Sequence, residues 1–193
     1  PPRIAWQEVT AIGHHLRVDE WDGEEGRWRP SALELPARLF EEFGQAQLQL
    51  TPDGRLIGLW RELDIDGGSL VVVGRQPHDG SATDAPGALE IDIFNDPPGD
   101  HGSPVLDVAD SPTLAWQVFD ATGVQSIRVA RVFDADGLDG PEPLTVSTPE
   151  QRFAALPAIA SLDGWSAVVW VDDARDGGTG DVFLSEIIWP ARR

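Results

Sequence analysis

The residues of this sequence that could do chemistry are mainly carboxylates. Asp and Glu together number 33 against 14 basic residues, all of them Arg, and the formal net charge is −19. Three of the acids, Asp134, Asp136 and Asp139, have a spacing at which loop oxygens can converge on Ca²⁺. The next alternate position is Leu138, however, and the bidentate Glu of an EF-hand loop is missing. We therefore interpret this loop as an acidic turn, keep these three residues as calcium candidates, and predict no metal site and no cofactor.

Other catalytic side chains are scarce. The absence of Cys and Tyr excludes thiol and phenol nucleophiles, disulfides and cysteine-bound metals. No serine lies in a Gly-x-Ser-x-Gly elbow. His14 and His15 are adjacent, so on a strand they would point to opposite faces and would not share a metal. The carboxylates are too numerous to single out an acid–base pair, and the acids at 172, 173, 176 and 181 are interpreted as solvating a loop. No catalytic residue is predicted.

Four tryptophans stand close to predicted turns or strand ends: Trp21, Trp28, Trp165 and Trp189. An indole in such a place can stack on a sugar or anchor a protein partner. These four are the candidate ligand-binding residues, with packing at a sheet rim as the alternative.

The charge balance limits the classes of partner. A chain of net charge −19 is repelled by nucleic-acid phosphates and by anionic membrane surfaces. No apolar run approaches the roughly 20 residues that a transmembrane helix needs. We predict no nucleic-acid binding and no membrane insertion.

The elements that must position these residues repeat along the chain. An apolar run ending in Trp occurs four times, at Trp6, Trp60, Trp116 and Trp170, at intervals of 54, 56 and 54 residues. A second apolar run follows each Trp, and its starts are 54, 57 and 55 residues apart. Two landmarks with one period indicate a repeat architecture. We predict that the four recurring indoles are core residues.

Each repeat divides into short β-type runs separated by turns. In the second repeat these runs cover 47–51, 55–62, 69–76 and 88–93, and Pro52-Asp53-Gly54 between the first two is typical of a hairpin. The second run is apolar throughout, which indicates a sheet covered on both faces. Four-stranded antiparallel blades stacked about an axis satisfy this pattern. The sequence therefore predicts an all-β fold of the β-propeller class.

The phase of the repeat is unusual. The expected segments are a partial blade at 1–35, complete blades at 46–93 and 104–147, and a partial blade at 157–189. The first lacks an initial strand and the last lacks a final one, so the two ends do not combine into one complete blade. We expect part of a larger ring of six to eight blades, or a protein partner or second copy that completes the propeller, because open sheet edges favour association.

The chain resembles the repeats of bacterial secreted or surface β-propellers at 131–137 and 168–183, where an apolar run, an acidic Gly-rich turn and an aliphatic strand follow one another. The segment 50–57 is similar to the Pro-Asp-Gly hairpin of Tol-type propellers, and 22–28 approximates an Asp-box. The resemblance implies a propeller that serves as a binding scaffold, located outside the cytoplasm. Sialidase activity, which the Asp-box would suggest, needs a Tyr nucleophile that this chain lacks.

Two functions follow as hypotheses. The first is a non-catalytic scaffold or interaction module, a subunit of a secreted, periplasmic or cell-surface assembly that binds protein or glycan. The alternative is a carbohydrate-active propeller enzyme of the glycoside hydrolase or lyase type, because propeller axes often hold active sites. The predicted axis-lining strands at 48–50, 105–108 and 158–161 contribute only Asp107 as a titratable group. This scarcity favours the first hypothesis.

Overall fold

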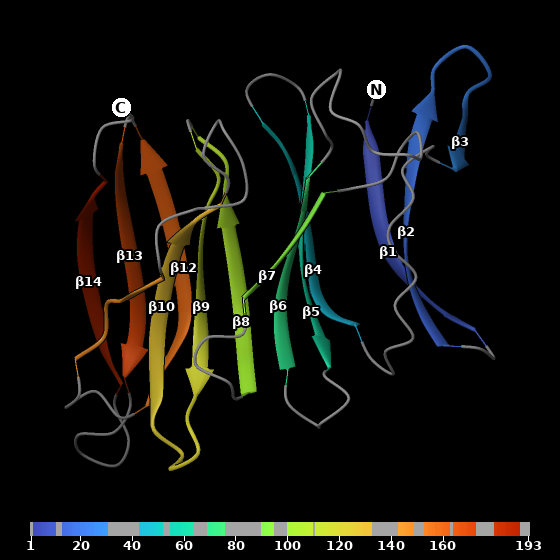
Figure 1. Ribbon diagram of the computed structural model, residues 1–193. Coiled ribbons are helices and arrows are strands. Elements are labelled where there is room, and N and C mark those ends of the chain that lie inside the picture. The colour runs from blue at the N-terminus through green and yellow to red at the C-terminus, as the bar shows by residue number, and fades with distance from the viewer. Residues whose placement is uncertain are drawn as a thin grey trace.

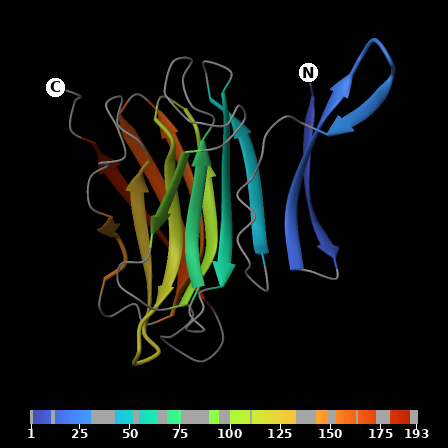
Figure 2. The ribbon, with the colours of Figure 1, turned by 45° about the vertical axis from the view of Figure 1, so that its right-hand side comes forward.

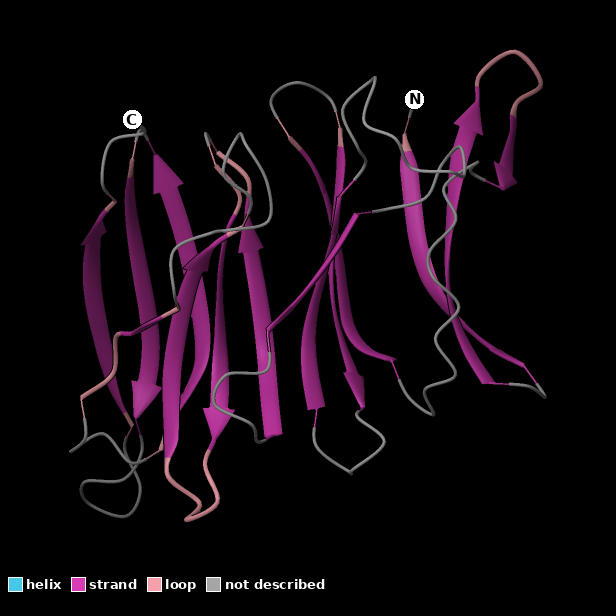
Figure 3. Cartoon of the chain, viewed as in Figure 1, coloured by secondary structure: helices cyan, strands magenta, loops and turns pink. Residues whose placement is uncertain are grey.

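The computed structural model describes residues 2–10, 13–30, 43–51, 55–63, 69–75, 90–94, 100–109, 111–132, 143–148, 153–162, 164–172 and 180–189. Every regular element within these ranges is a β-strand, as Figure 3 shows. In the part of the chain that the structure describes, no helix is long and apolar enough to span a bilayer.

The described strands form four antiparallel sheets. Sheet I contains β1 (Arg3–Thr10), β2 (Gly13–Asp22) and β3 (Arg27–Pro30). Sheet II contains β4 (Phe43–Leu50), β5 (Leu56–Leu63), β6 (Ser69–Arg75) and β7 (Glu90–Phe94). Sheet III contains β8 (Asp100–Asp107), β9 (Thr113–Phe119), β10 (Gln125–Arg131) and β11 (Leu144–Thr145). Sheet IV contains β12 (Ala154–Leu162), β13 (Trp165–Asp172) and β14 (Asp181–Ile188).

The sheets follow one another in chain order, with sheet I at one end of the molecule and sheet IV at the other (Figures 1 and 2). Within each sheet, strands that are consecutive in the chain are hydrogen-bonded neighbours. The first strands of sheets II, III and IV contact one another in turn, β4 against β8 and β8 against β12. Two four-stranded sheets flanked by two three-stranded ones confirm the predicted all-β fold of blades. The total number of blades in a complete ring stays a prediction.

Turn chemistry joins the strands as the sequence predicts. In the turn between β9 and β10, the carboxylate oxygen Oδ1 of Asp120 accepts hydrogen bonds from the Thr122 N–H (2.8 Å), the Thr122 hydroxyl (2.7 Å) and the Val124 N–H (2.9 Å). Gly123 has φ 81°, a left-handed conformation that glycine adopts without steric cost. The acidic Gly-rich sequence therefore fixes the hairpin and the register of its strands.

The core lies between the sheets. Trp116 of β9 belongs to a cluster with Ile57 and Leu59 of β5, between sheets II and III. Trp170 of β13 belongs to a second cluster with Ile127 of β10, between sheets III and IV. Residues of β9 are buried along nearly its whole length, as the uniformly apolar pattern of these strands predicts. Each central sheet is thus covered on both faces.

One of the four recurring indoles departs from the prediction. Trp60, Trp116 and Trp170 are 1%, 0% and 4% exposed, whereas Trp6 is 40% exposed. The prediction that Trp6 is a core residue is therefore wrong for this structure. The physical reason is its place at the end of the stack: among the described residues, no strand lies on the side of sheet I that carries Trp6.

Candidate functional site

The first strands of the blades are tied together by side chains that reach the backbone of the next blade. Gln49 Nε2 on β4 donates to the carbonyl of Leu106 on β8 (2.7 Å). The N–H of Ser161 on β12 donates to Asp107 Oδ2 on β8 (2.6 Å). Gln49 and Asp107 are equivalent in the repeat, because each pairs with the residue three places before the recurring Trp. Asp107, the axis-lining acid found in the sequence, thus fills a structural position that a neutral amide fills one blade earlier.

A polar network continues from this tie into sheet IV. The hydroxyl groups of Ser161 and Ser166 are 2.8 Å apart, and Trp189 Nε1 donates to Ser166 Oγ (2.8 Å). The Arg131 guanidinium lies 5.0 Å from the Trp189 ring centroid, which is within the range of a cation–π contact. Trp189 is only 5% exposed. This candidate ligand-binding indole therefore joins sheets III and IV and is not open to a sugar.

At the opposite end of the blades, where β8 begins, a buried histidine joins sheets II and III. His101 is 0% exposed. Its N–H donates to Ser69 Oγ (2.5 Å), Ser69 Oγ donates to the His101 carbonyl (2.7 Å), and the His101 ring Nδ1 contacts the Ser69 carbonyl. Arg61 Nη1 donates to the same His101 carbonyl (3.5 Å). The imidazole is held as part of the inter-sheet contact.

Two carboxyl groups meet at this end of sheet IV. Asp172, the last residue of β13, is directly opposite Asp181, the first residue of β14. Side chains opposite each other in an antiparallel pair lie on one face with Cβ atoms about 4.5–5.5 Å apart. Asp172 is 3% exposed, whereas Asp181 is exposed. A buried and an exposed carboxyl group thus lie side by side at the edge of sheet IV.

The sequence interpretation missed this pair, which it assigned to a solvated loop. The two acids are nine positions apart along the chain, and only the strand register shows that they face each other. Pairing the two expected strands residue by residue, starting from the turn between them, would have found them.

No metal site is formed by the described residues, among which no group of three or more His, Asp or Glu side chains could hold an ion. The calcium candidates Asp134, Asp136 and Asp139 lie outside the described residues. His14 and His15 lie on β2, opposite Val9 and Glu8 of β1.

The remaining tryptophan candidates lie at the two ends of the stack. Trp21 and Trp28 are opposite each other on β2 and β3, with ring centroids 5.4 Å apart and an edge-to-face angle of 66°. Trp28 is 39% exposed, and Trp165 at the start of β13 is 36% exposed. Each therefore offers part of an indole to a partner, from different sheets that are far apart.

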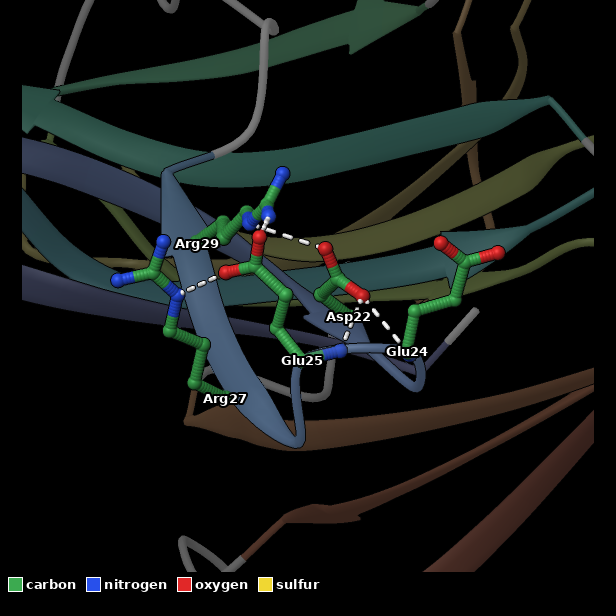
Figure 4. Close-up of polar contacts among 5 residues, drawn as sticks. All are labelled: Asp22, Glu24, Glu25, Arg27 and Arg29. Carbon is green, nitrogen blue, oxygen red and sulfur yellow. Dashed lines mark hydrogen bonds and ion pairs between the residues drawn. The ribbon is translucent and has the colours of Figure 1, made fainter.

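The hairpin that carries Trp21 and Trp28 is closed by an acidic turn with paired arginines (Figure 4). Asp22 Oδ1 accepts from the N–H groups of Glu24 (2.9 Å) and Glu25 (3.0 Å), and Asp22 Oδ2 lies 2.9 Å from Arg29 Nε. Glu25 pairs with Arg27 (2.6 Å) and with Arg29. The Glu25 N–H, and then the Glu24 N–H and Arg29, lower the pKa of Asp22 against an opposing desolvation. Exposed pairs of this kind order a turn and add little stability.

No protein-family description and no curated protein matches the chain. Solved structures with a similar fold include the following two. The first is described as a thermostable family-43 glycoside hydrolase: identity is 12%, the TM-score is 0.51, and the match covers 97% of this chain and 66% of that one. The second is an endo-arabinase from Bacteroides thetaiotaomicron VPI-5482, with 13% identity, a TM-score of 0.49, and coverage of 96% and 70%. The chain thus spans somewhat under two thirds of the family-43 protein that it matches.

The match to the family-43 protein confirms the β-propeller fold, since that structure is a five-bladed propeller. The closer resemblance to Asp-box-like or Tol-type repeats stays a prediction. The preference for a non-catalytic scaffold is corrected, because the structure matched at a TM-score of 0.51 is described as a glycoside hydrolase, which favours the alternative hypothesis. The preference rested on the acids of the axis-lining strands alone, where Asp107 accepts a hydrogen bond from the Ser161 N–H.

Proposed function

We propose that this protein is a carbohydrate-active β-propeller of the glycoside hydrolase kind. The observation that carries the proposal is the similarity of the fold to a family-43 glycoside hydrolase over 97% of the chain. The alternative hypothesis from the sequence, a carbohydrate-active propeller enzyme, names the same class of function. Glycosidic bonds are commonly hydrolysed by a pair of carboxyl groups, so the proposal requires such a pair on this chain.

The geometry limits which acids can work together. Asp107 is hydrogen-bonded to Ser161 near the end of β12, whereas Asp172 is paired with Ala154 at the start of β12. Seven residue steps of a strand separate these places by about 20 Å. Carboxyl pairs of glycosidases are at most about 9.5 Å apart. Asp107 and Asp172 therefore do not form one catalytic pair.

Asp172 and Asp181 satisfy the distance requirement, because directly opposite residues have Cβ atoms about 4.5–5.5 Å apart. Carboxyl groups on neighbouring Cβ atoms lie within the range of about 5–9.5 Å over which paired glycosidase acids act together. Asp181 is exposed and can meet a sugar from solvent, and Asp172 lies beside it at the edge of the buried core. We assign these two acids as the candidate catalytic pair.

The test is release of reducing sugar from a panel of plant and bacterial polysaccharides and aryl glycosides by the 193-residue chain. Asp172→Asn and Asp181→Asn are each expected to lower turnover at least about 100-fold. The matched controls are Asp107→Asn and Asp120→Asn, which remove the same charge from a structural tie and from an exposed turn. Absence of turnover on every substrate would contradict the proposed class. Turnover that survives both Asp172→Asn and Asp181→Asn would contradict only the assignment of the pair.

An enzyme that hydrolyses polysaccharides meets its substrate outside the cytoplasm, so we propose a secreted, periplasmic or cell-surface location. The support is the substrate class alone. Fractionation of producing cells, followed by detection of the chain with an antibody, would test the location separately from the activity.

A further inference from the structure

The outward face of sheet IV exposes apolar side chains at repeat positions that the other sheets bury. We call it the trailing face of sheet IV, meaning the face turned away from sheet III; its exposed residues include Val169 (37%), Val182 (73%) and Leu184 (61%). The strand register identifies the equivalent positions in the other sheets. Val169 directly precedes the recurring Trp170, and Leu184 pairs with Val169. Val182 pairs with the residue that follows Trp170. The equivalents are all 0% exposed: Leu59, Val71 and Val73 in sheet II, and Ala115, Ile127 and Val129 in sheet III.

The outward face of sheet I is the counterpart of this surface. We call it the leading face of sheet I; it carries Ile4 (41%), Trp6 (40%) and Trp28 (39%). The pairing of β1, β2 and β3 places these side chains on one side of the sheet, while Val18, at 6% exposure, lies on the other. Sheets III and IV present their equivalent indoles, Trp116 and Trp170, to the sheet before them.

The repeat thus defines a single kind of interface. The trailing face of sheet II receives Trp116, and the trailing face of sheet III receives Trp170. The trailing face of sheet IV has the same apolar positions, and the leading face of sheet I has the same indole in Trp6. The two end faces therefore share the apolar positions and the indole of the interior interfaces, although the leading face of sheet I also carries Glu8, Arg17 and Asp19.

The two faces do not meet within one molecule, because sheets I and IV lie at opposite ends of the stack in both views (Figures 1 and 2). We infer that a second copy of this chain docks head to tail, with the leading face of its sheet I on the trailing face of sheet IV. Such an interface joins different patches on the two copies and produces a closed ring or an open chain. The inference is independent of the proposed activity.

Charge sets the conditions for this association. Glu186, which pairs with Ala167, is the one charged side chain among the described residues of the trailing face. On the leading face, Arg17 is ion-paired with Glu8 (2.6 Å), and Asp19 is opposite Ile4. Each copy has a net charge of −19, and two copies repel each other at low ionic strength. Salt screens this repulsion, and it also strengthens apolar burial when the anion is sulfate. Association should therefore increase with salt.

The test is sedimentation velocity of the 193-residue chain over a hundredfold range of concentration, at 0.05 M and 0.5 M NaCl (about 14 Å and 4 Å of Debye length, respectively). Species of two or more copies are expected to increase with concentration and with salt. Trp6→Glu disables the leading face, and Leu184→Asp disables the trailing face; each is expected to weaken association at least about tenfold. Leu144→Asp is the matched control, since Leu144 is an exposed residue of β11 on neither face. Far-ultraviolet circular dichroism of each variant checks that it is folded.

A mixture of the two disabled variants gives the decisive result. The Leu184→Asp chain keeps an intact leading face, and the Trp6→Glu chain keeps an intact trailing face, so one functional interface remains between them. The mixture is expected to form a two-copy species that neither variant forms alone. A wild-type chain that stays a single copy under all these conditions would overturn the inference and leave another polypeptide as the occupant. Full association of the Trp6→Glu chain alone would also overturn it, because the trailing faces would then be packing against each other.

Discussion

The interface between sheets II and III and the two outward faces of the stack have the same side-chain pattern and opposite surroundings. Val71 and Val182 occupy equivalent positions, yet Val71 is fully buried and Val182 is 73% exposed. Trp116 and Trp6 differ in the same way, at 0% and 40%. The local sequence therefore specifies the kind of face that a strand presents. Whether the face is covered depends on what lies next to it in space.

The largest expected difference between the two regions concerns the recurring indole. Trp116→Ala removes a fully buried ring between sheets II and III, and we expect the free energy of unfolding to fall by about 3–5 kcal/mol. Trp6→Ala removes a ring that is already 40% exposed, and the expected loss is under about 1 kcal/mol in the single-copy state. Urea unfolding followed by circular dichroism at low protein concentration measures both. Similar losses for the two variants would mean that the outward face is covered within one molecule.

The polar contact inside the same interface is the next target. Ser69→Ala removes the hydroxyl that donates to the buried carbonyl of His101 and accepts from its N–H. Leaving two buried backbone groups without this partner should lower the free energy of unfolding by about 1–3 kcal/mol. Thr122→Ala, which removes a hydroxyl from an exposed turn, is the comparison and should cost less than about 1 kcal/mol. If Ser69→Ala costs no more than Thr122→Ala, the joint between sheets II and III does not depend on this side chain.

The tie between β8 and β12 should show a smaller effect. Asp107→Asn keeps an oxygen that can accept from the Ser161 N–H and makes this position resemble Gln49 of β4. The charge-assisted part of the bond is lost, and we expect a decrease of about 0.5–1.5 kcal/mol. Thermal unfolding of this variant measures the decrease, and Asp107→Ala should exceed it. A gain in stability would show that the position tolerates the neutral side chain better than the acid.

The smallest effect concerns pH at the exposed turns. Hydrogen bonds from Thr122 and from backbone N–H groups lower the pKa of Asp120, as those from Glu25 and Glu24 lower the pKa of Asp22. A lowered pKa in the folded state stabilises the protein above the unfolded pKa of about 3.9. This contribution is lost as the pH falls through the folded value. Carboxyl carbon NMR titration should give both pKa values below 3.9, and Asp120→Asn should weaken the dependence of stability on pH below about pH 4. Values at or above 3.9 would contradict the hydrogen-bonding explanation.

Much of the architecture could be predicted from the sequence, because the signals were local. Four consecutive residues, starting at Asp120, are enough to predict the turn. The uniform apolar run ending at Trp116 indicates a strand buried on both faces. The exposure of Trp6 could not be predicted in this way. Its neighbours in the sequence resemble those of Trp60, and the difference arises only from the absence of a described sheet on one side.

The candidate site was harder to predict than the fold, since its members come together through register. Asp172 and Asp181 bracket a segment of the chain and meet only because β13 and β14 pair residue by residue. Asp107 shows the opposite error. An acid on an axis-lining strand is a reasonable catalytic candidate until its hydrogen bond to the Ser161 N–H is known. Function class was likewise inferred from the number of acids at the axis, and side-chain counts do not report which acids are adjacent.

The stack has a direction, because each sheet carries the recurring Trp on one face and, on its other face, the apolar residues that pack against the Trp of the next sheet. A second copy of residues 100–153, inserted before Ala154, would bring its own Trp116 to pack against sheet III. It would also bring the apolar residues against which Trp170 packs. A protein lengthened by one such unit would therefore reuse the kind of contact that already joins sheets II, III and IV.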